Sequence, residues 1–131
     1  MKKIIFSLLI LVLIFTVPAC KKSDENYNVV GSWQFTMSSG NYNEGPYKTD
    51  FVGDATQGTW KMYIDLNENE FIAGTYEVVG NVIKMIITYV NYEGGLEGYF
   101  TGQFEKYNKI SGTWRAGDDG RFNSGTWVAI R

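Results

Sequence analysis

Residues 70–90 read EFIAGTYEVVGNVIKMIITYV, which is the pattern of a β-hairpin. On both sides of Gly80-Asn81, apolar and polar residues alternate with a period of two, as in strands with one buried face. A Gly-Asn pair between two such runs is the signal of a two-residue hairpin turn. The stretch therefore predicts two antiparallel strands, Glu70 to Val79 and Val82 to Val90. The side chains expected on their shared apolar face are Ile72, Tyr76, Val78, Ile83, Met85, Ile87 and Tyr89.

The same pattern extends in both directions along the chain. Turn signals separate further alternating runs, and no window predicts an amphipathic helix of useful length. Residues 116–121 are expected to form a loop, and 46–52 a short extra strand or edge segment within the long stretch 38–57. The sequence therefore predicts an all-β fold, an antiparallel up-and-down meander β-barrel of about eight strands. The other expected strands are Val29 to Met37, Gly58 to Leu66, Leu96 to Glu105, Lys109 to Arg115 and Phe122 to Ile130.

A tripeptide of Gly, then Ser or Thr, then an aromatic residue recurs along the chain, and every Trp lies in one copy. Within a barrel, Gly lets a strand bend or another group approach closely, and the aromatic ring fills the interior beside it. We therefore expect the four Trp side chains to be mostly buried. The copies are Gly31-Ser32-Trp33, Gly58-Thr59-Trp60, Gly74-Thr75-Tyr76, Gly112-Thr113-Trp114 and Gly125-Thr126-Trp127.

The N-terminal residues predict a targeting segment that precedes the barrel. A basic start and the apolar run 4–17 have the length of a signal-peptide core and are too short for a spanning helix. The run ends in Val17-Pro18-Ala19-Cys20, which resembles the lipobox of bacterial lipoproteins. An uncleaved anchor helix is the alternative. The expected division is a lipoprotein signal peptide at 1–19, a lipidated Cys20 (palmitate or a similar acyl chain) with a polar tether at 20–28, and a barrel domain at 29–131.

The predicted lipid attachment and the residues that follow it indicate where in the cell the protein is located. Ser23-Asp24-Glu25 resembles the surface-export signal that follows the lipidated cysteine in Bacteroidetes lipoproteins. We therefore expect a cell-envelope protein held to the outer membrane by its N-terminal lipid. The cell surface and the periplasmic face both stay open as its location.

Composition narrows the function classes. Cleavage removes Lys2 and Lys3, so the mature chain carries ten basic and fourteen acidic residues, a formal charge of −4. Nucleic-acid binders show basic stripes, so nucleic acid is not an expected partner. The chain has no His, which removes Ser-His-Asp and Cys-His catalysis. The stretch 65–69 mimics a calcium loop but has Glu70 where that loop needs Gly. We expect no enzymatic activity, no catalytic residue, no metal and no cofactor.

A family resemblance rests on Gly31-Ser32-Trp33. This motif on the first strand, with a hairpin meander behind it and a late Arg, resembles the lipocalins, in which the Arg packs over the first-strand Trp. Arg131 or Arg115 could take that role. With the lipobox, the chain resembles the small lipocalin-like, calycin-type lipoproteins of Bacteroidetes. It departs from lipocalins in being shorter and in lacking a helix before the closing strand. Avidin-type barrels, which also use Gly-Thr-Trp strands, are the alternative.

The resemblance implies a barrel that binds a small apolar ligand. Tyr89 or Tyr99 could supply polar groups at its mouth. The alternative is a solid-core protein-interaction or protease-inhibitor module, whose loops, chiefly segment 38–57, contact another envelope protein or a protease. The candidate ligand-binding residues are Trp60, Met62, Tyr76, Met85 and Phe100.

Overall fold

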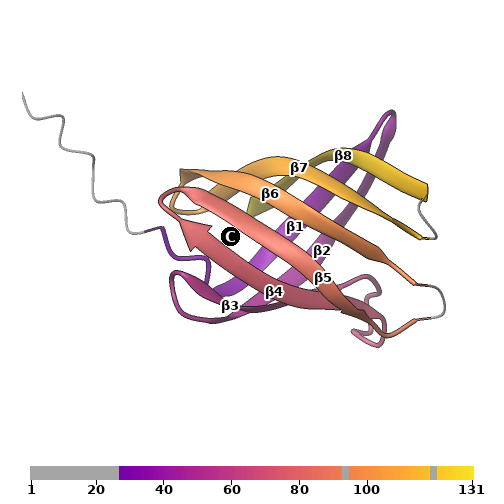
Figure 1. The fold of residues 1–131 in the computed structure, drawn as a ribbon, viewed down its shortest axis with the longest axis horizontal. Coiled ribbons are helices and arrows are strands. Elements are labelled where there is room, and N and C mark those ends of the chain that lie inside the picture. Colours follow the sequence, from indigo (N-terminus) through magenta and orange to yellow (C-terminus); the bar gives the residue numbers. More distant parts are fainter. Residues whose placement is uncertain (1–26, 93–94, 119–120) are drawn as a thin grey trace, which may run out of the picture.

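The computed structural model describes residues 27–92, 95–118 and 121–131 (Figure 1). The predicted signal peptide, Cys20, Ser23-Asp24-Glu25 and most of the tether lie outside the described residues. Within the described ranges no helix has the length and apolar content needed to cross a membrane. The strands are β1 (Gly31–Ser39), β2 (Tyr42–Gly53), β3 (Gln57–Tyr63), β4 (Phe71–Val79), β5 (Val82–Val90), β6 (Glu97–Lys106), β7 (Lys109–Asp118) and β8 (Arg121–Ile130).

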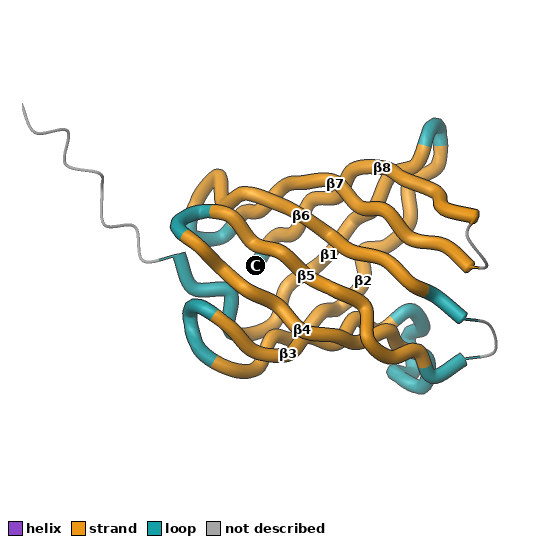
Figure 2. The backbone as a smooth tube through the Cα atoms, viewed as in Figure 1, coloured by secondary structure: helices purple, strands orange, loops and turns teal. Residues whose placement is uncertain are grey.

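The eight strands form a closed barrel, which confirms the predicted fold class (Figure 2). Each strand pairs antiparallel with its neighbour in sequence, and β8 closes the sheet by pairing with β1, where Ile130 lies opposite Gln34. All strand pairings lie within residues 31–130, so a chain that begins at residue 21 retains the complete barrel.

The segment 38–57 is not a loop. After a turn at Gly40, where φ is +57°, β2 runs for 12 residues and pairs with both β1 and β3. The expected short strand at 46–52 is therefore the inner part of a full barrel strand. The loop expected at 116–121 was also wrong, because Ala116 pairs with Asn123 and the hairpin continues to Asp118 and Arg121.

Two apolar residues of the expected strands lie outside: Leu66, where the alternation of the strand expected at 58–66 would point it inward, and Tyr89, which was expected on the apolar face. Leu66 is fully exposed because β3 ends at Tyr63 and the chain turns between Asp65 and Glu68. Tyr89 is 56% exposed because a β-bulge between β4 and β5 inserts one extra residue at Thr88. A bulge shifts the alternation by one position beyond it.

Two copies of the recurring tripeptide pair with each other across neighbouring strands, so that the aromatic residue of each lies opposite the Gly of the other. On β3 and β4, Trp60 lies opposite Gly74 and Tyr76 lies opposite Gly58. The Trp60 indole N–H donates to the carbonyl of Thr75 at 3.0 Å, so the residue after the glycine accepts the bond. A Cβ on Gly58 would come within 2.8 Å of the Tyr76 ring. Each strand thus supplies a ring to its neighbour and a space for its neighbour's ring.

The β7–β8 hairpin repeats this arrangement. Trp127 lies opposite Gly112 and donates its indole N–H to the carbonyl of Thr113 at 3.0 Å. Trp114 lies opposite Gly125, where an added Cβ would lie 2.8 Å from its indole nitrogen. Trp33, Trp60 and Trp127 are fully buried, as predicted, whereas Trp114 is half-buried.

Arg131 closes the barrel end at which the described chain begins. Its guanidinium carbon lies 4.6 Å from the centre of the Trp33 ring. The same group donates to the carbonyls of Val30 at 3.1 Å and Tyr107 at 3.0 Å. Of the two candidates, Arg131 therefore takes the position over the first-strand Trp, while Arg115 lies over the Phe122 ring at 4.9 Å.

Candidate functional site

The two ends of the barrel differ in how they are covered. We call the end with Arg131 the closed end, and the opposite end, where β1 turns into β2 and β3 into β4, the mouth (Figure 1). At the closed end the chain crosses the barrel before β1. There Val29 is fully buried, and Tyr27 stacks on Phe104 with ring centres 5.0 Å apart. A ligand that enters the barrel end-on would therefore use the mouth.

The five predicted ligand-binding residues all face the interior, and four of them are linked by strand register or by ring contact. Tyr76 lies opposite Met85, and Met85 lies opposite Phe100. The rings of Trp60 and Phe100 meet edge to face at 5.7 Å. All five side chains, including Met62, are at most 3% exposed. They form the packed core of the barrel.

The core continues across the barrel from these residues. Phe100 contacts Trp127 edge to face at 6.3 Å, and Trp127 stacks on Phe35 at 4.8 Å. Tyr89 and Tyr99, the expected polar groups of the mouth, lie on the outer face and are 56% and 49% exposed. That expectation was wrong.

Half-buried apolar side chains lie beyond the core at the mouth. They pack against the buried cluster but keep part of their surface exposed. A cleft of about 220 Å³ opens there between the β1–β2 hairpin and strands β7 and β8. Its lining residues are Met37, Ser38, Ser39, Tyr42, Glu44, Trp114 and Asn123.

A β-bulge places Glu44 in this cleft. Phe35 pairs with Tyr47 but Met37 pairs with Glu44, so Gly45 and Pro46 on β2 lie opposite the single residue Thr36, and β2 has one extra residue. Gly45 has φ +107°, and a Cβ there would come within 2.5 Å of the Phe35 carbonyl oxygen. Only glycine suits this position. The bulge thus brings a carboxylate beside the apolar floor formed by Met37.

Tyr47 holds the Glu44 carboxylate. Its hydroxyl donates a hydrogen bond to Glu44 Oε2 at 3.2 Å. Burial raises the pKa of the Tyr47 phenol, and the nearby Glu44 charge and hydrogen bond raise it further. Tyr47 therefore stays a protonated donor at neutral pH, and the other Glu44 oxygen can accept a hydrogen bond from a ligand.

Trp114 forms the second apolar wall of the cleft. Its indole N–H donates to the carbonyl of Ser38 at 3.3 Å, so the ring reaches from β7 past β8 to β1. The longer bond and the partial exposure of the side chain distinguish it from Trp60 and Trp127, whose N–H bonds are 3.0 Å. A planar apolar group could stack on this ring.

The far side of the mouth is fixed by Asn91. Its side-chain oxygen accepts the N–H of Phe71 at 2.6 Å, and its amide nitrogen donates to the carbonyl of Asn69 at 2.5 Å. These bonds join the end of β5 to the β3–β4 turn. Next to Asn91, burial raises the pKa of the Tyr92 phenol, and the Glu70 charge adds to this.

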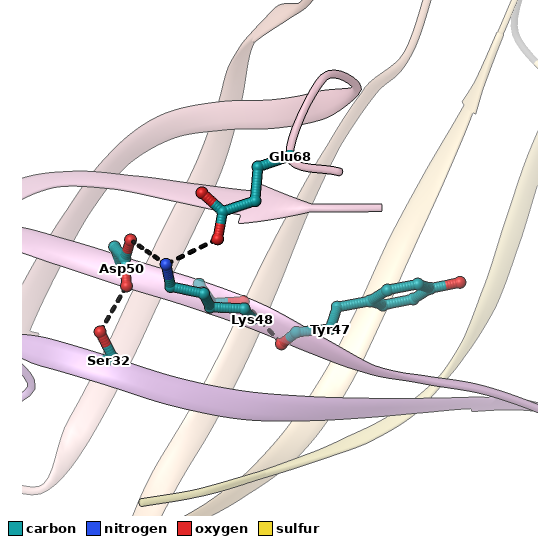
Figure 3. A network of polar contacts seen from close by, with 6 residues as sticks. Ser32, Tyr47, Lys48, Asp50 and Glu68 are labelled. Carbon is teal, nitrogen blue, oxygen red and sulfur yellow. Dashed lines mark hydrogen bonds and ion pairs between the residues drawn. The ribbon is translucent and has the colours of Figure 1, made fainter. Parts of the chain in front are cut away.

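A polar network on the outer wall supports the same turn (Figure 3). Lys48 on β2 forms ion pairs with Glu68 at 2.8 Å and with Asp50 at 3.7 Å. Ser32 on β1 donates to Asp50 at 2.5 Å. Exposed pairs of this kind stabilise little. The network joins the β3–β4 turn to β2 through the Lys48–Glu68 pair. Within the described residues, no group of three or more His, Cys, Asp or Glu side chains could hold a metal ion.

Sequence reasoning found the interior face but missed Met37, Glu44 and Trp114 as lining of a mouth. Gly45-Pro46 inside an otherwise alternating run was the available signal, since Gly and Pro within a strand mark a bulge. The alternation alone does not reveal it, because a bulge changes which residue faces inward.

Comparisons with known proteins place the fold. No protein-family model matches the chain, and no curated protein matches it. A solved structure described as EF1p2_mFAP2b bound to DFHBI is similar, with a TM-score of 0.65 and 14% identity over 82% of this chain and 98% of that chain. The closed eight-stranded barrel, the Arg131–Trp33 contact and this likeness together fit a lipocalin-like, calycin-type fold.

Proposed function

We propose that this protein is a lipid-anchored lipoprotein of the bacterial cell envelope that binds a small apolar ligand at the mouth of its barrel and catalyses no reaction. The observation that carries the proposal is the change in packing along the barrel axis. The middle of the barrel around Phe100 is filled, whereas Met37 and Trp114, which lies opposite Phe100 on β7, are half-buried and border a cleft. Small-molecule sites combine such apolar walls with a few polar groups.

The lining predicts the kind of ligand. A cleft of about 220 Å³ is below the usual ~300–1,000 Å³ of ligand pockets, so the ligand is small or protrudes into solvent. The apolar body would lie between Met37 and Trp114. Glu44 and Asn123 would receive a hydrogen-bond donor such as a hydroxyl or an ammonium group.

The anchor would orient this site. Residues 21–26 separate Cys20 from Tyr27, which packs at the closed end. Six extended residues span about 20 Å at most. A lipid on Cys20 would therefore hold the closed end near the membrane and leave the mouth facing away from it. The ligand would then exchange with the aqueous phase or with another protein.

The ligand site is tested on residues 21–131 with three probes of similar shape: 4-phenyl-1-butanol, 4-phenylbutylamine and 4-phenylbutyrate. We expect the alcohol and the amine to raise the melting temperature and to change Trp fluorescence. A probe at 100 times its Kd adds about 2.7 kcal/mol of stability. Trp114→Phe should remove most of the fluorescence change.

The role of the Glu44 charge in binding is tested with a variant of Glu44 and with a matched variant of an outer-face carboxylate. Glu44→Gln should weaken binding of the amine about tenfold, which corresponds to one lost charge-assisted hydrogen bond. Glu77→Gln changes an exposed carboxylate on the outer face of β4 and should leave binding unchanged. If none of the three probes shifts melting or fluorescence, the mouth is not a ligand site.

The anchor is tested separately in cells. Cys20→Ala should abolish labelling by radioactive palmitate and release the protein from membranes. Replacing Asp24 and Glu25 with Ala should reduce antibody labelling of intact cells if the protein is exported to the surface. Retention of Cys20→Ala in the detergent phase would contradict lipid anchoring.

A second candidate, the solid-core interaction or inhibitor module, is favoured by the filled middle of the barrel, where Trp60, Met62 and Met85 are at most 1% exposed. Segment 38–57 is mostly strand and so offers no long loop for a partner. The contact surface would instead be the turns that join the strands at the mouth. It becomes the leading function if none of the three ligand probes binds and the protein co-purifies from its membrane with one envelope protein that contacts the mouth.

A further inference from the structure

A groove of about 560 Å³ lies on the outer wall of the barrel, and none of the residues that line it also lines the mouth cleft. It follows the seam between β5 and β6. Pairing between these strands ends where Ile86 lies opposite Tyr99, while Tyr99 also lies opposite Arg115 on β7. Beyond this row, β6 stays paired with β7 but not with β5, so the side of β6 that faces β5 is left unpaired. The groove is thus part of the sheet geometry.

Three apolar side chains gather at this groove. Ile86, Tyr99 and Phe122 are 56%, 49% and 41% exposed. Exposed apolar residues that occur singly need no explanation, but adjacent ones that line one depression mark a binding surface. The groove also has a charged wall, formed by Arg115 and Lys84, with Glu97 as the only acidic residue among the described ones that line it.

Arg115 packs against an aromatic ring at this groove. Its guanidinium lies over the Phe122 ring at 4.9 Å, and no carboxylate among the side chains that the structure describes, which do not include that of Asp118, pairs with it within 4.0 Å. Stacking on a ring fixes the plane of a guanidinium and leaves its N–H edge free to bind a carboxylate through two hydrogen bonds. The two cations outnumber the single acid, so the groove favours an anion.

We propose that this groove binds a free anionic amphiphile, a carboxylate with an alkyl or aryl tail. The carboxylate pairs with the Arg115 guanidinium, and the tail lies along the seam against Tyr99 and Ile86. Glu97 repels the headgroup and so orients the molecule toward Arg115. This site is independent of the mouth, where Glu44 disfavours carboxylates.

The test uses residues 21–131 with dodecanoate and dodecyltrimethylammonium, each below its micelle concentration, measured by isothermal titration calorimetry. We expect dodecanoate to bind and the cationic amphiphile to bind at least tenfold more weakly. Arg115→Gln should weaken dodecanoate binding about tenfold, and Arg115→Lys should restore only part of it, because an ammonium cannot form the two-bond fork. Arg121→Gln is the matched control on a neighbouring exposed cation and should bind as the unmodified protein does.

Further variants separate this groove from the mouth and from a contact between two copies of the chain. Phe122→Ser should weaken dodecanoate binding with no change in the far-ultraviolet circular dichroism spectrum, whereas Glu44→Gln should leave this binding unchanged. Dodecanoate binding that is unchanged by Arg115→Gln, or lost in Glu44→Gln, overturns the outer site. So does a protein that sediments as a dimer and becomes monomeric on Tyr99→Ser, because the groove would then be covered by a second copy.

Discussion

The closed end and the mouth each contain a Trp from the recurring tripeptide, but the two Trp side chains differ in burial and in contacts. At the closed end Trp33 is fully buried, its N–H donates to the Val29 carbonyl at 2.6 Å, and Arg131 covers its ring. At the mouth Trp114 is half-buried, its N–H forms a longer bond of 3.3 Å, and no cation of the described residues covers its ring. The difference shows how one motif can serve stability at one end and leave a binding surface at the other. Each prediction below tests whether this division is real.

The largest effect is expected from Trp33→Ala. Removing a fully buried Trp typically costs about 3–5 kcal/mol, a large part of a total stability of about 5–15 kcal/mol. Trp114→Ala should cost roughly 1–2 kcal/mol, because its ring already contacts solvent. Urea denaturation of both variants measures the two costs. Equal losses would mean that the mouth is as much a part of the core as the closed end.

Arg131→Ala should come next, with a loss of roughly 1–2 kcal/mol. The change removes two hydrogen bonds to backbone carbonyls and the contact with the Trp33 ring. Arg131→Lys should recover only part of the loss, since one ammonium cannot span both carbonyls. The control is Arg121→Ala at the mouth end of β8, for which thermal unfolding should show no change.

The β2–β3 turn at the closed end should make stability depend on pH through Asp54. Its carboxylate accepts bonds from the backbone N–H of Thr56 and Gln57, and from the Thr56 hydroxyl, which lower its pKa in the folded protein. A carboxyl with a depressed folded pKa stabilises above its unfolded pKa, and this stabilisation is lost as the pH falls through the folded pKa.

Asp54→Asn tests this dependence. The variant should be less stable than the unmodified protein at neutral pH, and the difference should shrink as the solution is acidified below the ordinary range of an Asp carboxyl. Urea titrations at neutral and acidic pH measure it. A difference that is constant across this range would show that Asp54 acts without its charge.

The smallest effect on stability is expected from Glu44→Gln at the mouth, within about 0.5 kcal/mol, because the side chain is exposed. The change should instead lower the pKa of the Tyr47 phenol toward its ordinary value, because it removes the charge and weakens the hydrogen bond that help to raise it. The pKa should stay somewhat raised, since burial is the main cause. Phenolate absorbance during an alkaline titration measures it.

The sequence predicts the barrel well because its signals are local. Alternation around Gly80-Asn81 requires a hairpin, and the repeated hairpins require a meander. The inward direction of Trp60 and Met85 follows from the same alternation. The position of Tyr89 could not be predicted, because the bulge at Thr88 depends on how β5 pairs with β4.

The site was harder to predict for a related reason. That Trp60 and Phe100 face inward follows from the pattern, but whether they leave a space depends on how side-chain volumes fit across the barrel. The role of Thr75 and Thr113 as carbonyl acceptors for indole N–H groups also depends on the register between strands. Register is set by pairing, which a single strand's sequence does not contain.

The β1–β8 pairing has a consequence for how the chain folds. Every other pairing joins strands that follow one another in sequence, and such hairpins form in about 1–10 μs. Joining β1 to β8 brings together the two ends of the domain and must await the whole chain, so we expect it to be the slow step. During synthesis, β1 and β7 therefore remain open sheet edges, available to any other strand, until the ten residues of β8 have arrived.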